Sequence, residues 1–366
     1  MSETELIDDY RGLLLSQTPL LDVRAPVEFV QGAFPSAINL PLMNDQERQA
    51  VGIEYKQAGQ EAAIALGHQL VSGQLREQRI AQWAAFLGRH PDSVIYCFRG
   101  GLRSQIAQQW LGDVGWRRPR VLGGYKAMRQ FLLENLDERV RSTEFVVVGG
   151  LTGTGKTDVI AALSNKIDLE ALAHHRGSSF GGRTERQPSQ INFENSLSIE
   201  LLRLHQSNAT ALAVEDEAHL IGRCAVPLAL RNKTQQSPTI WVTAALDERV
   251  HRIQRDYIES LAQDYRLAFG PSEGIARYQT HLRKSLFNLH KRLGQQRHAQ
   301  LQTALDEALK QQLEHGAFDG HRQWIEPLLT TYYDPMYEYQ RQQRKGRVLF
   351  EGTTKEVTAF LQANGY

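Results

Sequence analysis

The eight residues Gly150–Thr157 limit the possible folds of this chain more strongly than any other segment. They read GLTGTGKT and fit the pattern G-x-x-x-x-G-K-[ST] in full. The apolar stretch FVVVGG (145–150) comes directly before the turn, and residues 157–166 behind it favour a helix. A strand, a glycine-rich turn and a helix in this order predict a phosphate-binding loop within a parallel α/β sheet.

Each residue type in this loop has a physical role. Gly150, Gly153 and Gly155 allow backbone N–H groups to surround a phosphate, and Lys156 brings a cation to its outer oxygens. The Thr157 hydroxyl is a candidate ligand for a metal ion. The alternative, a flexible glycine turn without a ligand, is disfavoured by the position of the motif between a strand and a helix.

An acidic partner for the metal is expected at the end of another strand. The segment ALAVEDEAHLIGR (211–223) supplies Glu215 and Asp216 directly after four apolar or small residues. Either carboxylate is a candidate for holding an Mg²⁺-bound water, and the spacing does not choose between them. A solvated acidic turn is the competing interpretation.

The loop HHRGSSFGGRTERQPSQINFEN (174–195) combines flexible backbone with guanidinium groups. Arg176 and Arg183 are therefore candidates for binding an anionic ligand. A mobile surface loop explains the same composition.

The first part of the chain also alternates short apolar strands with helices. Strands are expected at 19–25, 37–41, 93–98 and 118–124, and helical periodicity extends over 62–90. This order predicts a second parallel sheet. We therefore expect two domains, residues 1–138 and residues 139–366, the second carrying helical additions toward the C-terminus.

The segment YCFRGGLRS places Cys97 after one of these strands. Gly100 and Gly101 permit a turn whose N–H groups point inward, while Arg99 and Arg103 add positive charge. A thiolate or another anion would be stabilised there, which makes Cys97 the candidate nucleophile. The alternative is a buried structural cysteine.

Composition limits the compartment. The only other cysteine, Cys224, lies far away and is interpreted as structural, so no disulfide framework is expected. No segment approaches about 18 uninterrupted apolar residues, and the acidic start MSETELIDDY does not resemble a signal peptide. These features predict a cytoplasmic protein without a membrane span.

A basic helical segment is the candidate nucleic-acid surface. Residues 277–298 contain leucines at helical spacing and no acidic residue. The opposite face carries the candidate nucleic-acid-binding residues Arg283, Lys284, Lys291 and Arg292. A solvated basic helix is an equally good interpretation of the charge alone.

Two resemblances combine these signals. The first 130 residues or so resemble a rhodanese domain, in which Cys97 occupies the position of the sulfur- or selenium-carrying cysteine, and Asp22 and Arg24 of the first motif are expected to be structural. The whole chain resembles the tRNA 2-selenouridine synthase family. The segments that carry this resemblance are CFRGGLRS (97–104), GGLTGTGKT (149–157), HRGSSFGG (175–182), QPSQINFEN (187–195), VEDEAHLIG (214–222) and YYDPMYEYQ (332–340).

The resemblance implies a transferase with a rhodanese-like domain followed by a P-loop domain. It implies that wobble 2-thiouridine in the tRNA anticodon loop is converted to 2-selenouridine through an S-geranyl intermediate. Geranyl diphosphate and selenophosphate would be the substrates, with no tightly bound cofactor, and a selenophosphate-supplying enzyme is a candidate partner. Whether selenium passes covalently through Cys97 stays open. The alternatives are an ATP-dependent sulfurtransferase or kinase-like enzyme with a sulfur carrier, and a non-catalytic sulfur-state sensor.

Overall fold

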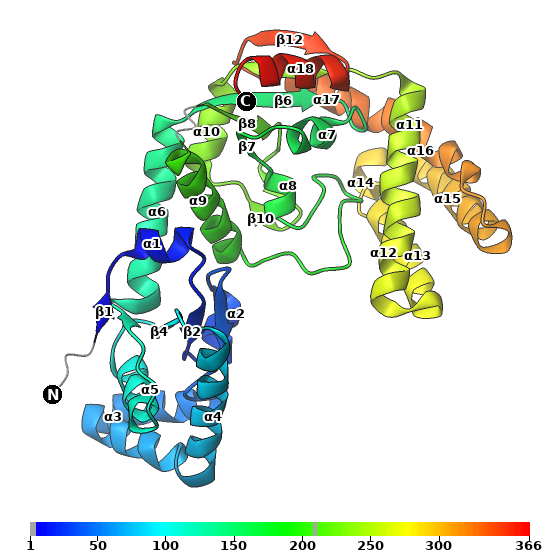
Figure 1. The fold of residues 1–366 in the computed structure, drawn as a ribbon. Coiled ribbons are helices and arrows are strands. Elements are labelled where there is room, and N and C mark those ends of the chain that lie inside the picture. The colour runs from blue at the N-terminus through cyan, green and yellow to red at the C-terminus, as the bar shows by residue number, and fades with distance from the viewer. Residues whose placement is uncertain (1–4, 208–210) are drawn as a thin grey trace. The chain divides into compact units, whose positions relative to one another are not determined.

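The computed structural model describes residues 5–207 and 211–366, which form two compact units. The first unit contains the chain up to Glu138 together with Ser189–Arg203. The second contains Arg139–Pro188 and the chain from Leu204 to Tyr366. Each unit is built on a parallel sheet with helices, which confirms the predicted α/β class (Figure 1).

The sheet of the first unit has five strands in the order β1-β5-β4-β2-β3, and all neighbours are parallel. Its strands are β1 (Leu6–Ile7), β2 (Leu20–Asp22), β3 (Ala37–Asn39), β4 (Val94–Tyr96) and β5 (Arg120–Val121). The connecting helices are α1 (Tyr10–Leu15), α2 (Pro26–Gln31), α3 (Asp45–Leu70), α4 (Gly73–Arg89), α5 (Leu102–Asp113) and α6 (Gly124–Ser142). Parallel neighbours need such crossover connections.

The predicted helical stretch 62–90 is divided between α3 and α4. The break falls at Val71 and Ser72, and Gly73 then has a φ of +50°. Val71 is buried in the same core as its helical neighbours, so the apolar periodicity continues across the break. Periodicity alone therefore could not locate the boundary.

A buried ion pair holds the end of β2. The Arg24 guanidinium donates hydrogen bonds to the Asp22 carboxylate and to the Gly32 carbonyl oxygen, at 2.6 Å and 2.8 Å respectively. The Tyr96 hydroxyl donates to the same carboxylate at 2.6 Å. Because every charge has a partner, the pair belongs to the scaffold, as the sequence predicts for Asp22 and Arg24.

Helix α9 (Gln190–Gln206) contributes its first part to the first unit. Asn192 Oδ1 accepts a hydrogen bond from the Ala33 amide at 2.7 Å, and Asn195 Nδ2 donates to the Ala33 carbonyl at 2.8 Å. Asn135 Nδ2 donates to the Ser198 carbonyl at 2.9 Å. The motif QINFEN therefore has a structural role in fixing the turn at Ala33.

The sheet of the second unit has the strand order β12-β11-β6-β8-β7, again all parallel. Its strands are β6 (Glu144–Gly150), β7 (Lys166–Ile167), β8 (Ala211–Glu215), β11 (Thr239–Val242) and β12 (Val348–Gly352), and β9 (Leu220–Ile221) and β10 (Cys224–Ala225) form a separate hairpin. From β6 the chain crosses to β7 at one edge and comes back to β8 beside β6, and it later passes to β11 on the other side of β6. Ligands of open α/β sheets bind at such a reversal, beyond the carboxyl ends of the strands.

Helices surround this sheet and extend beyond it, which confirms the predicted C-terminal helical additions (Figure 1). Those of the second unit are α7 (Lys156–Ala161), α8 (Leu169–Leu172), α10 (Leu228–Gln236), α11 (Leu246–Gln254), α12 (Ser260–Phe269), α13 (Pro271–Phe287), α14 (His290–Leu293), α15 (Gln295–His315), α16 (Arg322–Leu328), α17 (Asp334–Gln343) and α18 (Thr354–Ala363). π-Helical turns occupy Arg255–Glu259 and Leu329–Tyr333, and a 3₁₀ turn occupies Asp319–His321. None of the described helices combines the length and apolar character that a membrane span requires.

A neutral histidine is built into the helical core. His321 is fully buried, its Nδ1 accepts a hydrogen bond from Trp324 Nε1 at 3.0 Å, and its Nε2 lies 2.9 Å from Gln312 Oε1. Nε2 therefore carries the proton and donates it to Gln312. Burial lowers the pKa of His321 to about 4.

This histidine predicts a loss of stability in acid. The unfolded chain takes up the proton near pH 6.5, whereas the folded chain resists it until about pH 4, so stability present above pH 6.5 is lost as the pH falls. Between pH 8 and pH 5 we expect His321 to remove about 2 kcal/mol of the free energy of unfolding. Urea unfolding followed by circular dichroism should show a shallower pH dependence for His321→Gln. Equal slopes for both proteins would contradict the prediction.

Candidate active site

The phosphate loop, residues 150–157, joins the end of β6 to α7. Gly153 and Gly155 have φ values of +82° and +93°, which L side chains rarely adopt. A Cβ atom at Gly153 would lie 2.9 Å from the Arg249 carbonyl oxygen, and one at Gly155 would lie 2.9 Å from Thr354 Oγ1. Both glycines are therefore required by backbone conformation and by close packing.

Lys156 folds back over this loop. Its Nζ donates hydrogen bonds to the carbonyl oxygens of Gly150 at 2.9 Å and Leu151 at 3.1 Å. It also lies 5.2 Å from the centre of the Tyr337 ring. Burial lowers the pKa of Lys156, whereas nearby carboxylates, above all Glu217, act in the opposite direction. The Lys156 ammonium group therefore lies against the backbone of the phosphate loop.

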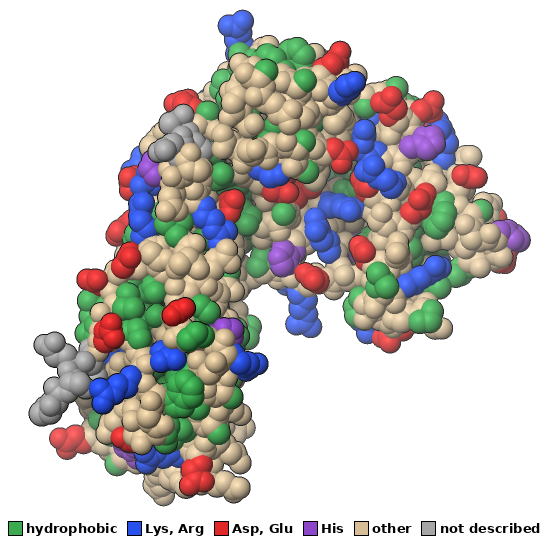
Figure 2. Space-filling view, viewed as in Figure 1, with side chains coloured by type: hydrophobic (Ala, Val, Ile, Leu, Met, Phe, Trp, Pro, Cys, Tyr) green, Lys and Arg blue, Asp and Glu red, His purple; other side chains and the backbone are tan. Residues whose placement is uncertain are grey.

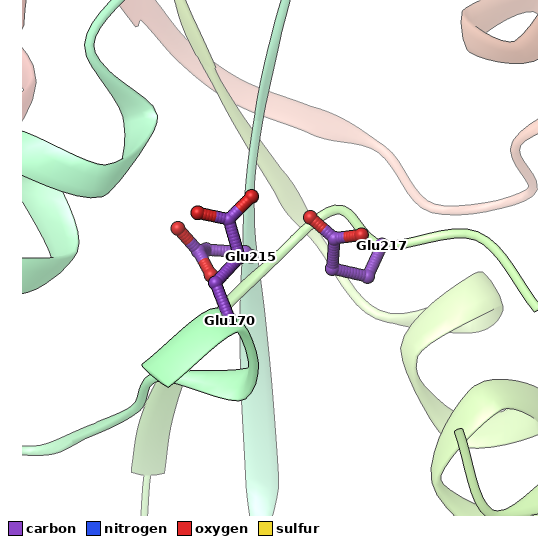
Figure 3. A group of neighbouring side chains, drawn as sticks. All are labelled: Glu170, Glu215 and Glu217. Atoms are coloured by element: carbon purple, nitrogen blue, oxygen red, sulfur yellow. The ribbon is translucent and has the colours of Figure 1, made fainter. Parts of the chain in front are cut away.

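Three carboxylates lie close to one another (Figure 3), and their charges act on Lys156. Glu170 comes from α8, Glu215 from the end of β8 and Glu217 from the following loop, and one oxygen of each lies within 4.8 Å of the others. Thr157 Oγ1 donates to Glu170 Oε2 at 3.2 Å. We call Glu170, Glu215 and Glu217 the carboxylate cluster.

The glutamates of the carboxylate cluster repel one another when they are charged. Burial, followed by repulsion from Glu170, raises the pKa of Glu215 well above its usual value and that of Glu217 to about 8. Glu215 is 3% exposed, and its Oε2 has no hydrogen-bond partner among the described residues. A hard cation would supply the missing partner, because its preferred ligands are carboxylate and hydroxyl oxygens.

The two sequence candidates at the end of β8 occupy different surroundings. Glu215 belongs to the carboxylate cluster, whereas the Asp216 carboxylate forms an ion pair with Arg344. Glu170 was not identified from the sequence. Glu170 lies in the short helix α8, and only the fold of the chain after α7 brings its side chain to the carboxylate cluster. The sequence signal for Glu170 was therefore weak.

Arginines line a pocket of about 230 Å³ together with Glu170 and Glu217 of the carboxylate cluster, and we call it the phosphate pocket. The phosphate loop lines one side, and the basic residues around it are Arg176, Arg183, Arg252 and Arg255. Arg252 also donates to the Gly153 carbonyl oxygen at 2.6 Å. The pocket therefore brings both sequence candidates, Arg176 and Arg183, to the phosphate loop.

Arg252 and Arg255 were missed by the sequence analysis, although a signal existed. Arg249, Arg252 and Arg255 recur every three residues directly behind the strand β11, which places them along one helical face. Arg249 is buried and fixes the loop, since its Nε donates to the Thr152 carbonyl at 2.9 Å and its Nη1 to Asp334 at 3.0 Å.

A narrow apolar recess adjoins the phosphate pocket. The two share Thr152, Ser178, Ile253 and Tyr257 as lining residues. The other residues of the recess are Phe180, Trp324, Ile325, Leu328, Leu329 and Tyr333. A ligand with an anionic end and a hydrocarbon end would match both surfaces.

The thiol loop, residues 97–104, follows β4 in the first unit. Cys97 is 3% exposed, and its Sγ lies 3.2 Å from Ser104 Oγ and 3.8 Å from the Gly101 carbonyl oxygen. Gly100 has a φ of +65°, and a Cβ atom there would lie 2.8 Å from the Val121 carbonyl oxygen. Ser104, which the sequence analysis did not single out, is thus the hydroxyl group nearest the thiol.

Arg120 is the buried cation of the thiol loop. It is 4% exposed, and its Nη1 donates to the Gly100 carbonyl at 2.9 Å while its Nε donates to Gln108 Oε1 at 2.6 Å. Burial lowers the pKa of Arg120, and the charge of a Cys97 thiolate acts in the opposite direction. Sequence reasoning missed Arg120 because it reaches the loop only through the pairing of β4 with β5.

The two arginines proposed from the motif lie farther out. Arg99 is exposed, with its guanidinium carbon 5.9 Å from the centre of the Phe98 ring. Arg103 donates to both Glu28 oxygens, at 2.5 Å and 3.1 Å. Burial opposes the shift, but these bonds lower the pKa of Glu28. The charge of Arg103 is therefore largely compensated.

The basic helical segment has the predicted two faces. Its leucines are buried, while the four basic candidates are exposed: Arg283, Lys284, Lys291 and Arg292. Arg283 pairs with Asp306 at 2.7 Å, and Arg292 donates to the Tyr332 hydroxyl at 3.1 Å. On the face drawn in Figure 2, basic and acidic side chains are interspersed. A role in tRNA binding stays a prediction.

Comparison with known proteins gives two independent similarities. Residues 143–365 match the family model described as the tRNA 2-selenouridine synthase AAA domain. Proteins named tRNA 2-selenouridine synthase from Bordetella bronchiseptica and Pseudomonas entomophila are 52% and 51% identical to the chain. They cover 98% and 97% of it, over 97% and 96% of their own lengths.

One solved structure is also similar in sequence. It is the N-terminal domain of a putative ATP/GTP binding protein from Clostridium difficile 630, with 35% identity. The match covers 35% of this chain and 99% of that chain, with a TM-score of 0.33.

The buried position of Arg120 predicts that it activates the Cys97 thiol. Arg120→Met should slow alkylation of the Cys97 thiol by iodoacetamide at pH 7 by about tenfold, because the nearby positive charge is lost. Arg120→Lys should retain much of the reactivity, and Arg117→Met, at an exposed position, should retain all of it. Modification is followed by mass spectrometry of the Cys97 peptide. Unchanged reactivity in Arg120→Met would contradict this role.

Proposed function

The chain belongs to the tRNA 2-selenouridine synthase family, and we propose that it converts wobble 2-thiouridine of tRNA to 2-selenouridine by two successive group transfers. The first would attach a geranyl group to the sulfur atom, and the second would replace the geranylated sulfur with selenium. The two anion-binding loops suit these two reactions. We assign the first transfer to the phosphate pocket and the second to the thiol loop.

In the first transfer, the sulfur on C2 of the uracil ring attacks the allylic carbon of geranyl diphosphate. A C–S bond forms, the C–O bond breaks with its electron pair going to diphosphate, and ring N3 loses its proton. Negative charge develops on the departing diphosphate. The N–H groups of the phosphate loop, Lys156 and the surrounding arginines are suited to stabilise that charge.

The observation that carries this assignment is the apolar recess beside the phosphate pocket. The recess is lined by aromatic and aliphatic side chains such as Phe180, Trp324 and Leu329. The recess measures about 20 Å³, so it would receive part of a prenyl chain whose diphosphate contacts the phosphate loop. This combination favours a prenyl diphosphate over the ATP of the alternative sulfurtransferase or kinase-like function.

In the second transfer, the selenium of selenophosphate attacks C2 of the alkylated ring. A C–Se bond forms, the C–S bond breaks, and geranylthiol leaves after taking up a proton. Water then cleaves the Se–P bond, which releases phosphate and leaves 2-selenouridine. The rhodanese-like thiol loop suits this step, because the Arg120 charge and the Ser104 hydroxyl lie beside Cys97 and would stabilise an anion there.

The carboxylate cluster fits an Mg²⁺ ion. Its oxygens together with Thr157 Oγ1 are hard ligands, and the buried Glu215 Oε2 has no other partner in the described chain. Glu170, Glu215 and Glu217 would hold the ion, with Thr157 beside it. A bound Mg²⁺ would neutralise part of the charge of a diphosphate.

The tRNA substrate is consistent with an exposed basic face on helices α13 and α14. Lys284 and Lys291 would contact the phosphate backbone there. The anticodon loop is unpaired, so its wobble base can enter a pocket at low energetic cost. A reaction on tRNA places the protein in the cytoplasm, where an enzyme that produces selenophosphate would supply the second substrate.

The assignment of the two transfers to two different sites predicts different effects for two variants. Lys156→Ala should reduce formation of S-geranyl-2-thiouridine from geranyl diphosphate by about 100-fold or more, because a group that stabilises the leaving diphosphate is lost. Cys97→Ser should form the S-geranyl nucleoside and accumulate it when selenophosphate is added. Mass spectrometry of digested tRNA measures both products.

Matched controls are available for both changes. Lys166→Ala removes a lysine whose Nζ donates to the Ala161 carbonyl, and Cys224→Ser changes the buried cysteine beside Pro188. Both should behave as wild type. If Lys156→Ala and Cys97→Ser stall at the same product, the assignment is wrong. ATP turnover that depends on Lys156 would favour the alternative function.

The proposed metal site predicts a selective loss of ion binding. Mg²⁺ at about ten times its Kd should stabilise the wild type by about 1.4 kcal/mol. The Tm should rise accordingly, by roughly 2–4 °C for each kcal/mol. Glu215→Gln should lose this shift and, without Mg²⁺ at pH 8, should be at least as stable as wild type, because one buried repulsive charge is gone. Asp216→Asn should keep the shift. If Asp216→Asn loses the shift and Glu215→Gln keeps it, the ion binds at Asp216 instead.

A further inference from the structure

A pocket of about 920 Å³ opens beside the thiol loop in the first unit. Residues of α3 and α5 line it together with the thiol-loop residues Arg99, Leu102 and Arg103. Its volume lies in the range of small-molecule sites, about 300–1,000 Å³. The proposed reaction at Cys97 does not account for a space of this size, because selenophosphate is a small, wholly polar ion. We call this pocket the chain groove.

The floor of the chain groove is apolar and belongs to the core that contains Cys97. Leu42, Met43, Val71 and Trp110 line the groove, and the same residues cluster with Cys97 in the hydrophobic core. Val51 and Ile106 pack against that core from the groove side. A hydrocarbon group lying in the groove would thus pack on the same core, beside the thiol-loop residues Arg99, Leu102 and Arg103.

The mouth of the chain groove leaves apolar surface uncovered. Ile53 is 47% exposed, Tyr55 is 58% exposed and Leu102 is 42% exposed. All three line the groove, so each adds exposed apolar surface to it. Exposed apolar surface gathered around a concave site indicates a ligand that covers it.

The rim of the chain groove is positively charged. Its basic residues are Arg48, Lys56, Arg99 and Arg103, and none of the described lining residues is acidic. Glu28 compensates Arg103 and Arg48, at 2.5 Å and 3.6 Å. Lys56 and Arg99 are exposed, and the described part of the chain offers neither of them an ion pair. The groove therefore suits a hydrocarbon chain attached to a polyanion.

We propose that the chain groove binds the hydrocarbon substituent of the S-alkylated wobble nucleoside, with the flanking RNA phosphates near Lys56 and Arg99. This inference rests on the proposed function and extends it to the placement of the intermediate during the selenium transfer. Burial of the chain holds C2 of the ring at the thiol loop. The groove thereby selects alkylated RNA over RNA that still carries unmodified 2-thiouridine, because only the former has a chain to bury.

The test compares two anticodon stem-loop RNAs, one with S-geranyl-2-thiouridine and one with S-methyl-2-thiouridine. Selenation by selenophosphate is measured as kcat/KM with the full-length protein. We expect wild type to prefer the geranyl RNA by at least about tenfold. Ile53→Asp should lower this preference to about threefold or less by slowing the geranyl RNA, with the methyl RNA unchanged.

Three controls separate groove binding from other effects. Val30→Asp places the same charge at a 73% exposed apolar position outside the groove and should keep the preference. Ile53→Leu should also keep it. Geranylation of 2-thiouridine RNA by Ile53→Asp should match wild type, because that reaction is assigned to the phosphate pocket. A loss of geranylation instead would overturn the proposal, since the groove would then serve geranyl diphosphate.

Direct binding distinguishes failure of the groove from failure of the proposed function. The S-geranyl-2-thiouridine nucleoside is titrated into wild type and Ile53→Asp by equilibrium dialysis, with the S-methyl nucleoside as reference. Binding that depends on Ile53 without any selenation would support the groove and overturn the proposed function. Selenation with an undiminished preference in Ile53→Asp would overturn the groove and leave the function. If the protein shows no binding of the nucleoside and no selenation, both the groove and the proposed function are overturned.

Discussion

The Lys156 ammonium shares a buried space with the carboxylate cluster, and this charge balance determines what the second unit can bind. Lys156 donates to two carbonyl oxygens of its own loop, whereas one oxygen of Glu215 has no hydrogen-bond partner among the residues that the structure describes. An entering phosphate would draw Lys156 away from the carboxylates and leave them with less countercharge. Anion and divalent cation are therefore expected to bind together, because each removes the electrostatic cost of the other.

The parts of the site that follow from sequence are those made by neighbours along the chain. The glycines and Lys156 stand in one loop between β6 and α7, and Cys97 stands in one loop between β4 and α5, so strand and helix patterns located both. The groups that complete each site come from elsewhere. Glu170 arrives through α8, and Arg120 arrives through the pairing of β5 with β4. Such contacts depend on strand order, which local patterns do not encode.

The same distinction explains the break between α3 and α4 and the role of QINFEN. Apolar periodicity records which residues face the core, and Val71 faces it even though the helix has ended there. The asparagines of QINFEN belong to a segment that carries the family resemblance, yet their side chains form hydrogen bonds with the backbone of Ala33. A distinctive motif can therefore mark a structural contact between distant segments as readily as a reactive group.

The two apolar surfaces of the molecule impose a constraint on the proposed reaction sequence. One adjoins the phosphate pocket and the other adjoins the thiol loop, and the same hydrocarbon chain would occupy each in turn. Binding that is equally tight before and after a chemical step slows release without speeding the step. The recess of the second unit is narrow, at about 20 Å³, whereas the chain groove is far larger. A recess of this size holds only part of the hydrocarbon chain of the alkylated product, which would favour transfer of the chain onward to the chain groove, where it departs with the sulfur.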